Sequence, residues 1–153
     1  MSQPEERAMS QPTTDHLACA HCGFQLWHPV AALTACDAGL YDDGRFPGRL
    51  ILSARTHFDH LDEMPAHQLA EVMADVQVAS RVLRDLADVQ RVNVAILGNC
   101  VPHVHAHLIP RRATDVNIGR APWDGAPSRY GLGDDERARL TGLLIHGFDS
   151  HPV

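Results

Sequence analysis

The sequence predicts an α+β fold in which a mainly antiparallel sheet carries one long central helix and a C-terminal helix. Two observations support this class. Short apolar segments with strand character occur on both sides of one long amphipathic segment, and a second helical segment closes the chain. The expected order is therefore strand, strand, helix, strand, strand, helix. With 153 residues, the chain is long enough to form one domain with its own core and without disulfides.

The first half of the sheet is expected from two short apolar segments. Val30–Cys36, with the sequence VAALTAC, and Gly48–Ala54, with the sequence GRLILSA, each indicate a strand. The stretch DDGRFPG between them is rich in Asp and Gly, which is typical of a turn. These segments are therefore expected to form a hairpin.

The central helix is predicted from apolar residues that recur at helical spacing after Pro65. They form one face of the segment: Leu69, Val72, Met73, Val76, Val78, Val82 and Leu83. Proline is favoured in the first turn of a helix. We therefore expect one amphipathic helix of about 20 residues with Pro65 in its first turn.

The second half of the sheet is expected from Val92–Gly98, with the sequence VNVAILG, and from the histidine-rich segment that follows it. The last helix is predicted to start near Asp134, because acidic residues there would fill its first turn. Gly147 is expected near its end, since glycine commonly follows the last helical residue.

The composition divides the chain into three parts. Residues 1–15 contain almost no large apolar side chains and are expected to be disordered. Residues 16–130 are expected to form the domain. Residues 131–153 are expected to form the C-terminal helix and tail.

Composition and charge also limit the class of protein. Hydrophobic residues make up 44% of the chain and charged residues 21%, as in soluble globular proteins, and no apolar run is long enough to cross a membrane. The start of the chain has no apolar signal core, so we expect a cytoplasmic protein with reduced cysteines. A net charge of −6, from 19 acidic and 13 basic residues, argues against nonspecific nucleic-acid binding. A small phosphate-bearing ligand is compatible with it.

Three histidines alternate with apolar residues in the segment NCVPHVHAHLIPR: His103, His105 and His107. On a strand they would share one face, with the apolar residues on the other. Histidines on a solvated edge strand are one interpretation, which this strict alternation disfavours. A shared zinc ion is disfavoured, because His103 and His107 would lie about 13 Å apart on a strand. A neutral imidazole can instead act as a nucleophile while its neighbours bind phosphate oxygens.

These residues also resemble a known family. HVHAHLI resembles the His-φ-His-φ-His-φ-φ signature of the histidine triad (HIT) superfamily of nucleotide hydrolases and transferases. The segments RFPGRLILSARTHFDHLDEM, NVAILGNCVPHVHAHLIPRR and APWDG follow one another as in its compact bacterial members. The resemblance spans residues 17–125. It implies a HIT-like domain, an adenine-type nucleotide as substrate, and a homodimer.

The resemblance implies a catalytic role for three residues. His105 would attack the α-phosphate and carry the nucleotidyl group, while His107 would contact the phosphate and assist. Asn99 would donate a hydrogen bond to a phosphate oxygen, or would serve only as a turn residue. The loop before the triad is cut to GNCVP, whereas many relatives carry a longer Gly-rich loop. The source of a proton for the leaving group and the substrate class are therefore open.

The remaining nucleotide contacts implied by the resemblance lie outside the triad. Asp42, or its neighbour Asp43, would hold the ribose, although both residues are also common in turns. Arg49 stands where many members have a histidine, and would reach a phosphate or face solvent. Trp123 would cover the nucleotide or the dimer seam, or would serve in ordinary packing.

A C-x-x-C pair, Cys19 and Cys22, lies near the N-terminus. Such a pair needs two further ligands to hold zinc. The resemblance supplies them, because several members combine the pair with a histidine after the second strand and with the first triad histidine. Here these are His57 and His103, with His60 as the alternative to His57. A structural Cys2His2 zinc site that pins the N-terminal segment to the triad strand is therefore expected.

The function implied by the resemblance is hydrolysis at the α-phosphate of dinucleoside polyphosphates or nucleoside phosphoramidates through a nucleotidyl-histidine intermediate. Two alternatives are kept. One is a nucleotidyl transferase or phosphorylase of the same superfamily, and the other is a nucleotide-binding regulatory module with little turnover. The presence of His105 favours an enzyme, because a module without turnover has no chemical need for it.

Overall fold

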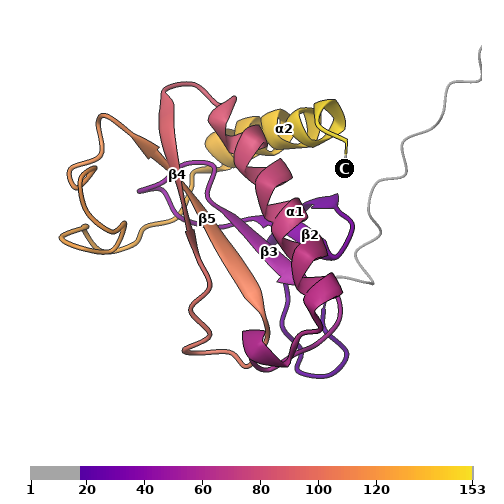
Figure 1. Cartoon of the computed structure of the whole chain (residues 1–153). Helices are drawn as coiled ribbons and strands as arrows, with labels where there is room; N and C mark the ends of the chain where they lie inside the picture. The colour runs from indigo at the N-terminus through magenta and orange to yellow at the C-terminus, as the bar shows by residue number, and fades with distance from the viewer. Residues whose placement is uncertain (1–17, 153) are drawn as a thin grey trace, which may run out of the picture.

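The computed structural model describes residues 18–152, so the predicted tail at residues 1–15 lies outside the described part of the chain. The elements follow in the order β1 (His28–Ala32), β2 (Cys36–Leu40), β3 (Leu50–Ala54), the short 3-10 helix η2 (Leu61–Glu63), α1 (Ala66–Arg84), β4 (Val89–Ala95), β5 (His105–Arg112) and α2 (Asp134–Ser150). The fold is α+β, as predicted from the sequence (Figure 1).

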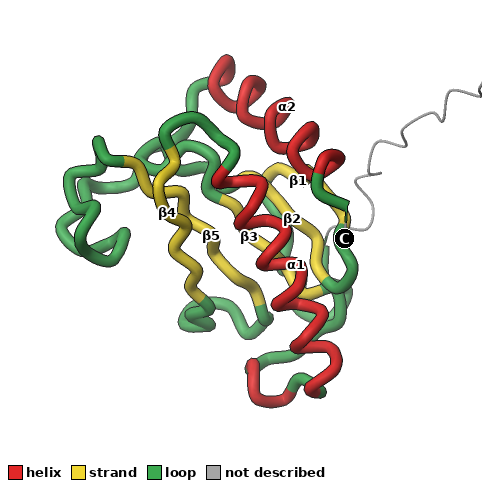
Figure 2. Tube along the Cα trace, turned by 45° about the horizontal axis from the view of Figure 1, so that its top comes forward, coloured by secondary structure: helices red, strands yellow, loops and turns green. Residues whose placement is uncertain are grey.

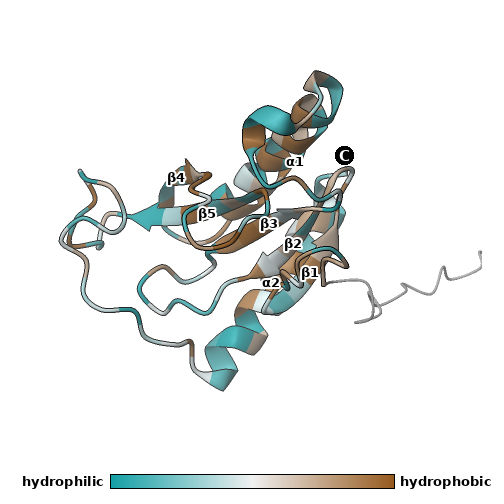
Figure 3. Ribbon diagram, turned by 90° about the horizontal axis from the view of Figure 1, so that it is seen from below, coloured by the Kyte–Doolittle hydropathy of each residue, from teal (hydrophilic) through white to brown (hydrophobic). Residues whose placement is uncertain are grey.

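The strands form one antiparallel sheet in the order β1-β2-β3-β5-β4. Helix α1 covers one face of this sheet, and α2 lies next to α1 and to the edge strand β1 (Figures 1 and 2). The core fills the space between them, with buried residues such as Leu52 of β3, Leu108 of β5, Val76 of α1 and Leu144 of α2. Hydrophobic residues accordingly run along the central strands (Figure 3). The opposite face of the sheet carries His105 and His107, and we name it the triad face.

The segment Val30–Cys36 is not one strand, which corrects the sequence prediction. β1 ends at Ala32, the chain turns, and β2 begins at Cys36. The turn is held from a distance by Asp75, a fully buried residue of α1. Its carboxylate accepts hydrogen bonds from the backbone N–H groups of Thr34, Ala35 and Cys36 at 3.1, 2.7 and 2.9 Å. A contact across about 40 positions of sequence cannot be detected by a local pattern.

Two other boundaries differ from the prediction. β4 spans Val89–Ala95 in place of Val92–Gly98, because its pairing with β5 ends where Ala95 meets His107. α2 continues past Gly147 to Ser150. Gly147 is a packing residue, since a Cβ there would lie 2.7 Å from Cγ1 of Val82 in α1. α1 begins at Ala66 with Pro65 as its N-cap, close to the predicted start.

Among residues 18–152, neither helix is both long and apolar enough to cross a membrane.

Candidate functional site

The start of β5 brings the three predicted histidines together. His105 and His107 lie on the triad face, with ring centroids 5.1 Å apart. His103 lies two residues before β5, so only two of the three histidines predicted to share one strand are on it. Phe24, from the N-terminal segment of residues 18–26, stacks on both His103 and His105 with centroid distances of 4.8 Å. The N-terminal segment therefore covers the triad face at the point where β5 begins.

His103 points one ring nitrogen into the protein and the other toward the cysteines. Its Nε2 lies 3.0 Å from the carbonyl oxygen of Ala54 and 2.9 Å from Oγ of Ser53. A carbonyl oxygen only accepts hydrogen bonds, so Nε2 carries the proton. Nδ1 keeps its lone pair and lies 3.5 Å from Sγ of Cys22. Burial lowers the pKa of His103, so the ring is neutral.

His57 has the same arrangement. Its Nε2 donates to the carboxylate of Asp59 at 2.6 Å, and this bond raises the pKa of His57. In the neutral ring the proton is on Nε2, and Nδ1 has a lone pair. That Nδ1 lies 3.5 Å from Sγ of Cys19 and 3.2 Å from Nδ1 of His103. When both rings are neutral, two nitrogen lone pairs face each other across 3.2 Å with a sulfur beside each. Such a contact is stabilised either by a proton on Nδ1 of His57 or by a metal ion between the rings.

The four groups have the separations of a tetrahedral metal site. The ligand atoms of Cys19, Cys22, His57 and His103 all lie within 4.8 Å of one another. Tetrahedral bonds of about 2.3 Å to sulfur and about 2.05 Å to nitrogen put a sulfur and a nitrogen about 3.5 Å apart, and two nitrogens about 3.3 Å apart. The observed distances of 3.5, 3.5 and 3.2 Å agree with these values. The cluster can hold a metal ion.

The surroundings of the cluster favour ligation. Metal-bound histidines usually donate their second N–H to a carboxylate or a carbonyl group, as His57 and His103 do here. Burial raises the pKa of Cys19, but hydrogen bonds to its sulfur, from backbone groups first, outweigh this and lower the pKa to about 7. His60, the predicted alternative to His57, does not belong to this group of ligands.

His105 has the opposite tautomer. Its Nδ1 lies 2.7 Å from the carbonyl oxygen of His103 and must donate to it. In the neutral ring the proton is thus on Nδ1, and Nε2 has a lone pair with no hydrogen-bond partner among the described residues. A neutral imidazole with a free Nε2 can attack an electrophile. Phe24 on one side and His107 on the other restrict the orientation of the ring.

His107 accepts a hydrogen bond from Arg49, whose Nη2 lies 2.9 Å from its Nδ1. A guanidinium only donates, so Nδ1 is unprotonated and the proton of the neutral ring is on Nε2. Burial, the charge of Arg49 and the nearby His105 lower the pKa of His107 to about 4. Near neutral pH, His107 can therefore donate one hydrogen bond from Nε2 without carrying charge.

Asp43 lies behind Arg49 and has no exposed surface. Its carboxylate accepts a hydrogen bond from Nη1 of Arg49 at 2.8 Å, and two more from the guanidinium of Arg45 at 2.8 Å each. Burial raises the pKa of Asp43, but the bonds from Arg45 and Arg49 outweigh it and lower the pKa. A ligand cannot reach this carboxylate without displacing an arginine.

Asp42, the first choice for the ribose, lies under the segment that leads into α2. Its Oδ1 accepts a hydrogen bond from the backbone N–H of Leu132 at 2.7 Å, and its carbonyl oxygen accepts one from Arg129. Oδ2 has no hydrogen-bond partner among the described residues. Asp42 thus keeps one acceptor atom for a ligand.

Asn99 and Trp123 are not part of the hydrogen-bonded network around the three histidines. Asn99 is exposed in the loop between β4 and β5 and has no side-chain hydrogen bond among the described residues. Trp123 is 54% exposed and lines a cavity beside the edge strand β4, with Arg120, Ala121 and Pro122. The structure therefore does not join these two residues to the triad by direct contacts.

Several side chains of the site were not predicted. Phe24, Ser53 and Asp59 fix the rings of the histidines. Asp59 follows His57 by two positions in THFDH, a spacing that could have suggested a contact. Phe24 and Ser53 carry no local signal, because their roles depend on strand register and on the path of the N-terminal segment.

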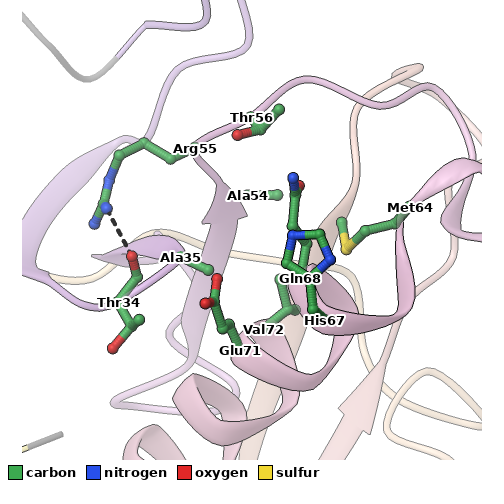
Figure 4. Close-up of a pocket in the computed structure, with 10 residues that line it drawn as sticks. All are labelled: Thr34, Ala35, Ala54, Arg55, Thr56, Met64, His67, Gln68, Glu71 and Val72. Atoms are coloured by element: carbon green, nitrogen blue, oxygen red, sulfur yellow. Dashed lines mark hydrogen bonds between the residues drawn. The ribbon is translucent and has the colours of Figure 1, made fainter.

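A separate pocket lies between α1 and the ends of β2 and β3 (Figure 4). It is lined by residues that include His67, Gln68, Glu71 and Arg55. The guanidinium of Arg55 is already bonded to carbonyl oxygens of the β1–β2 turn and to Asp37. No triad or cluster residue lines this pocket, so it is distinct from the candidate site.

Comparisons with known proteins agree with the fold and the motif. The model of the HIT domain family matches residues 33–114. An uncharacterized HIT-like protein of Methanocaldococcus jannaschii is 31% identical over an alignment of 78 residues, and the match covers 48% of this chain and 60% of that protein. The match thus spans less than two thirds of that relative.

Solved structures are similar over most of the chain. A histidine triad protein from Marinobacter aquaeolei has a TM-score of 0.71 and 25% identity, with 81% of this chain and 90% of that chain covered. A zinc-bound histidine triad family protein from Mycobacterium smegmatis has a TM-score of 0.61 and 22% identity, with 80% and 86% covered. The second likeness, at this low identity, concerns the fold alone.

Proposed function

Because the chain belongs to the HIT domain family, we propose that it binds an adenine-type nucleotide and cleaves its α-phosphate linkage through a nucleotidyl group on His105. The observation that carries this proposal is the hydrogen bond from Nδ1 of His105 to the carbonyl oxygen of His103 at 2.7 Å. It holds the ring in the tautomer whose Nε2 is nucleophilic. The same bond stabilises the positive charge that the ring acquires once Nε2 is bonded to phosphorus.

The other predicted residues receive roles that fit their positions. His107 donates from Nε2 to a phosphate oxygen beside the nucleophile. Asn99, in the exposed loop before the triad, reaches a phosphate oxygen when substrate is bound. Asp42 keeps a free carboxylate oxygen for the ribose, whereas the buried Asp43 acts through Arg49. Trp123 lies beside β4 and contributes to the dimer seam at this edge of the sheet.

We propose zinc for the Cys2His2 cluster of Cys19, Cys22, His57 and His103. Two thiolates and two imidazoles at tetrahedral separations are a donor set typical of structural zinc. Bound there, the ion would join the N-terminal segment to the start of β5 and so hold Phe24 against His105. His103 would then be a metal ligand, which leaves His105 and His107 for the chemistry.

A homodimer is proposed along the edge strand β4. Val94 of that strand is 43% exposed, and Leu97 and Trp123 nearby are also exposed. An unpaired strand edge with apolar side chains favours pairing with another strand. Sedimentation equilibrium of the wild-type protein tests this directly, and a monomer at micromolar concentration would refute it.

The function is tested by product analysis with diadenosine polyphosphates and adenosine phosphoramidate, each with and without inorganic phosphate. We expect release of AMP from at least one substrate. A nucleoside diphosphate formed only with phosphate would identify the phosphorylase alternative. His105→Ala should abolish turnover, while His67→Ala, an exposed histidine of α1 outside the site, is the matched control. Absence of turnover by wild type, or full turnover by folded His105→Ala, refutes the proposal.

A further inference from the structure

A continuous chain of polar contacts leads from the buried carboxylate of Asp43 to the ring of His107. Nη1 of Arg49 is 2.8 Å from Asp43, and Nη2 of the same guanidinium is 2.9 Å from Nδ1 of His107. Tyr41 lies against the other side, with its ring centroid 4.3 Å from the guanidinium carbon. Arg49 is thus fixed by a carboxylate and an aromatic ring, and it has one terminal nitrogen to offer to His107.

The surroundings of His107 oppose its protonation. Two positively chargeable groups face the ring, Arg49 from the segment before β3 and His105 from β5. Tyr41, after β2, meets it edge-on at 5.9 Å and provides no negative charge. Asp43 is separated from the ring by the guanidinium, and Arg49 blocks Nδ1 with a donor that cannot be deprotonated. Burial first, and then these positive charges, lower the pKa of His107 to about 4.

We propose that Asp43 and Arg49 are positioning residues that lock His107 as a neutral Nε2–H donor, and that the site is therefore built for substrates whose leaving group departs as a phosphate anion. This inference rests on the proposed function and names its substrate class. Nucleoside polyphosphates belong to that class. Phosphoramidates do not, because their nitrogen needs a proton as it leaves.

The difference lies in the first step. The Nε2 lone pair of His105 forms a bond to the α-phosphorus, and the bond from phosphorus to the leaving atom breaks with its electron pair on that atom. A phosphate oxygen keeps this pair as a stable anion and needs only a hydrogen bond from His107. An amine nitrogen must gain a proton, which a neutral imidazole gives up very poorly. In the second step water attacks phosphorus, the pair returns to His105, and one water proton passes to solvent.

We call the chain of contacts from Asp43 through Arg49 to His107 the relay. It is tested without any measurement of turnover, by NMR titration of the ring nitrogens of His107 in the full-length protein. We expect the Nε2–H tautomer in the wild type, with protonation only below about pH 5. Arg49→Gln should raise the midpoint by about one pH unit or more. Arg45→Gln is the matched control, because Arg45 bonds to Asp43 but not to His107, and it should leave the midpoint unchanged. Arg49→Lys serves if Arg49→Gln fails to fold.

A midpoint near pH 6.5 in the wild type, or equal midpoints in the wild type and the folded Arg49 variant, overturns the relay. The substrate class is tested by kcat/KM for a diadenosine polyphosphate and for adenosine phosphoramidate. We expect the wild type to favour the anhydride by about tenfold or more, and Arg49→Gln to narrow this ratio at pH 6, where His107 can become an acid. An equal or reversed wild-type preference overturns the substrate class. If neither substrate is turned over, the proposed function is refuted. The NMR titration of His107 would still test the relay independently.

Discussion

The Nδ1 atoms of His57 and His103 lie 3.2 Å apart, and each Nε2 donates a hydrogen bond, so both Nδ1 atoms have a lone pair when the rings are neutral. With Cys19 and Cys22 beside them, these atoms form a site for a cation. The triad is therefore divided: its first histidine faces the cysteines, and the other two lie on the triad face.

Zinc content is the first prediction. Elemental analysis of the purified protein should give about one zinc per chain, since a Cys2His2 cluster saturates the tetrahedral coordination of one ion. Cys19→Ser combined with Cys22→Ser should lose the metal and lower the melting temperature. Cys100→Ser changes an exposed cysteine outside the cluster. This variant should keep the zinc ion and the wild-type melting temperature. A metal-free wild type of unchanged stability would contradict the assignment.

Acid sensitivity is the second prediction. The pKa of His107 is about 4 in the folded protein and 6.5 for an unperturbed histidine. Between these values the unfolded chain binds more protons, so this residue's contribution to stability is present above pH 6.5 and is lost as the pH falls toward 4. In urea unfolding, His107→Gln should lose less stability than wild type over that range. If the free energy of unfolding depends on pH in the same way for the two proteins, His107 does not titrate as proposed.

The contact between α2 and α1 gives a third prediction. Gly147→Ala places a methyl group 2.7 Å from Val82 and should destabilise the protein by about 1–3 kcal/mol, offset in part by the better helix propensity of alanine. Gly142→Ala, in the same helix with open space around it, should stabilise by about 0.5–1 kcal/mol. Equal effects of the two changes in thermal unfolding would mean that this packing is not tight.

The β1–β2 turn gives a fourth prediction. Asp75→Ala removes the acceptor of three backbone N–H groups and should cost about 3 kcal/mol or more. Glu71→Ala, one turn earlier on the exposed side of α1, should change stability by less than about 0.5 kcal/mol. Chemical denaturation measures both, and a small cost for Asp75→Ala would show that the turn forms without this carboxylate.

Much of the fold follows from periodicity. The helical spacing after Pro65 predicted the start and the approximate length of α1, and the alternation at His103–His107 predicted a strand that contains His105 and His107. The merged strand at Val30–Cys36 could not be resolved locally, because the turn inside it is held by Asp75 of α1, which lies far away in sequence. Gly147 lies three residues before the end of α2 and packs on Val82.

The site was predicted unevenly for a similar reason. The cluster of Cys19, Cys22, His57 and His103 came together as expected, because the C-x-x-C pair is visible in the sequence and the family resemblance supplied the two histidines. Arg49 was seen as a departure from the family, but its bond to His107 depends on the burial of Asp43. Burial of a polar residue in a turn cannot be deduced from a local pattern that favours exposure.

The central claim is that His105 carries the nucleotidyl group, and direct detection of that adduct tests it. The protein is mixed with a diadenosine polyphosphate, quenched in acetonitrile at neutral pH within milliseconds to seconds, digested, and examined by mass spectrometry. We predict one nucleotidyl group on the peptide that contains His105, located at His105 by fragmentation. The adduct should be absent from His105→Ala and present in His67→Ala. Turnover with no adduct at His105, or with the adduct on another residue, would contradict the mechanism.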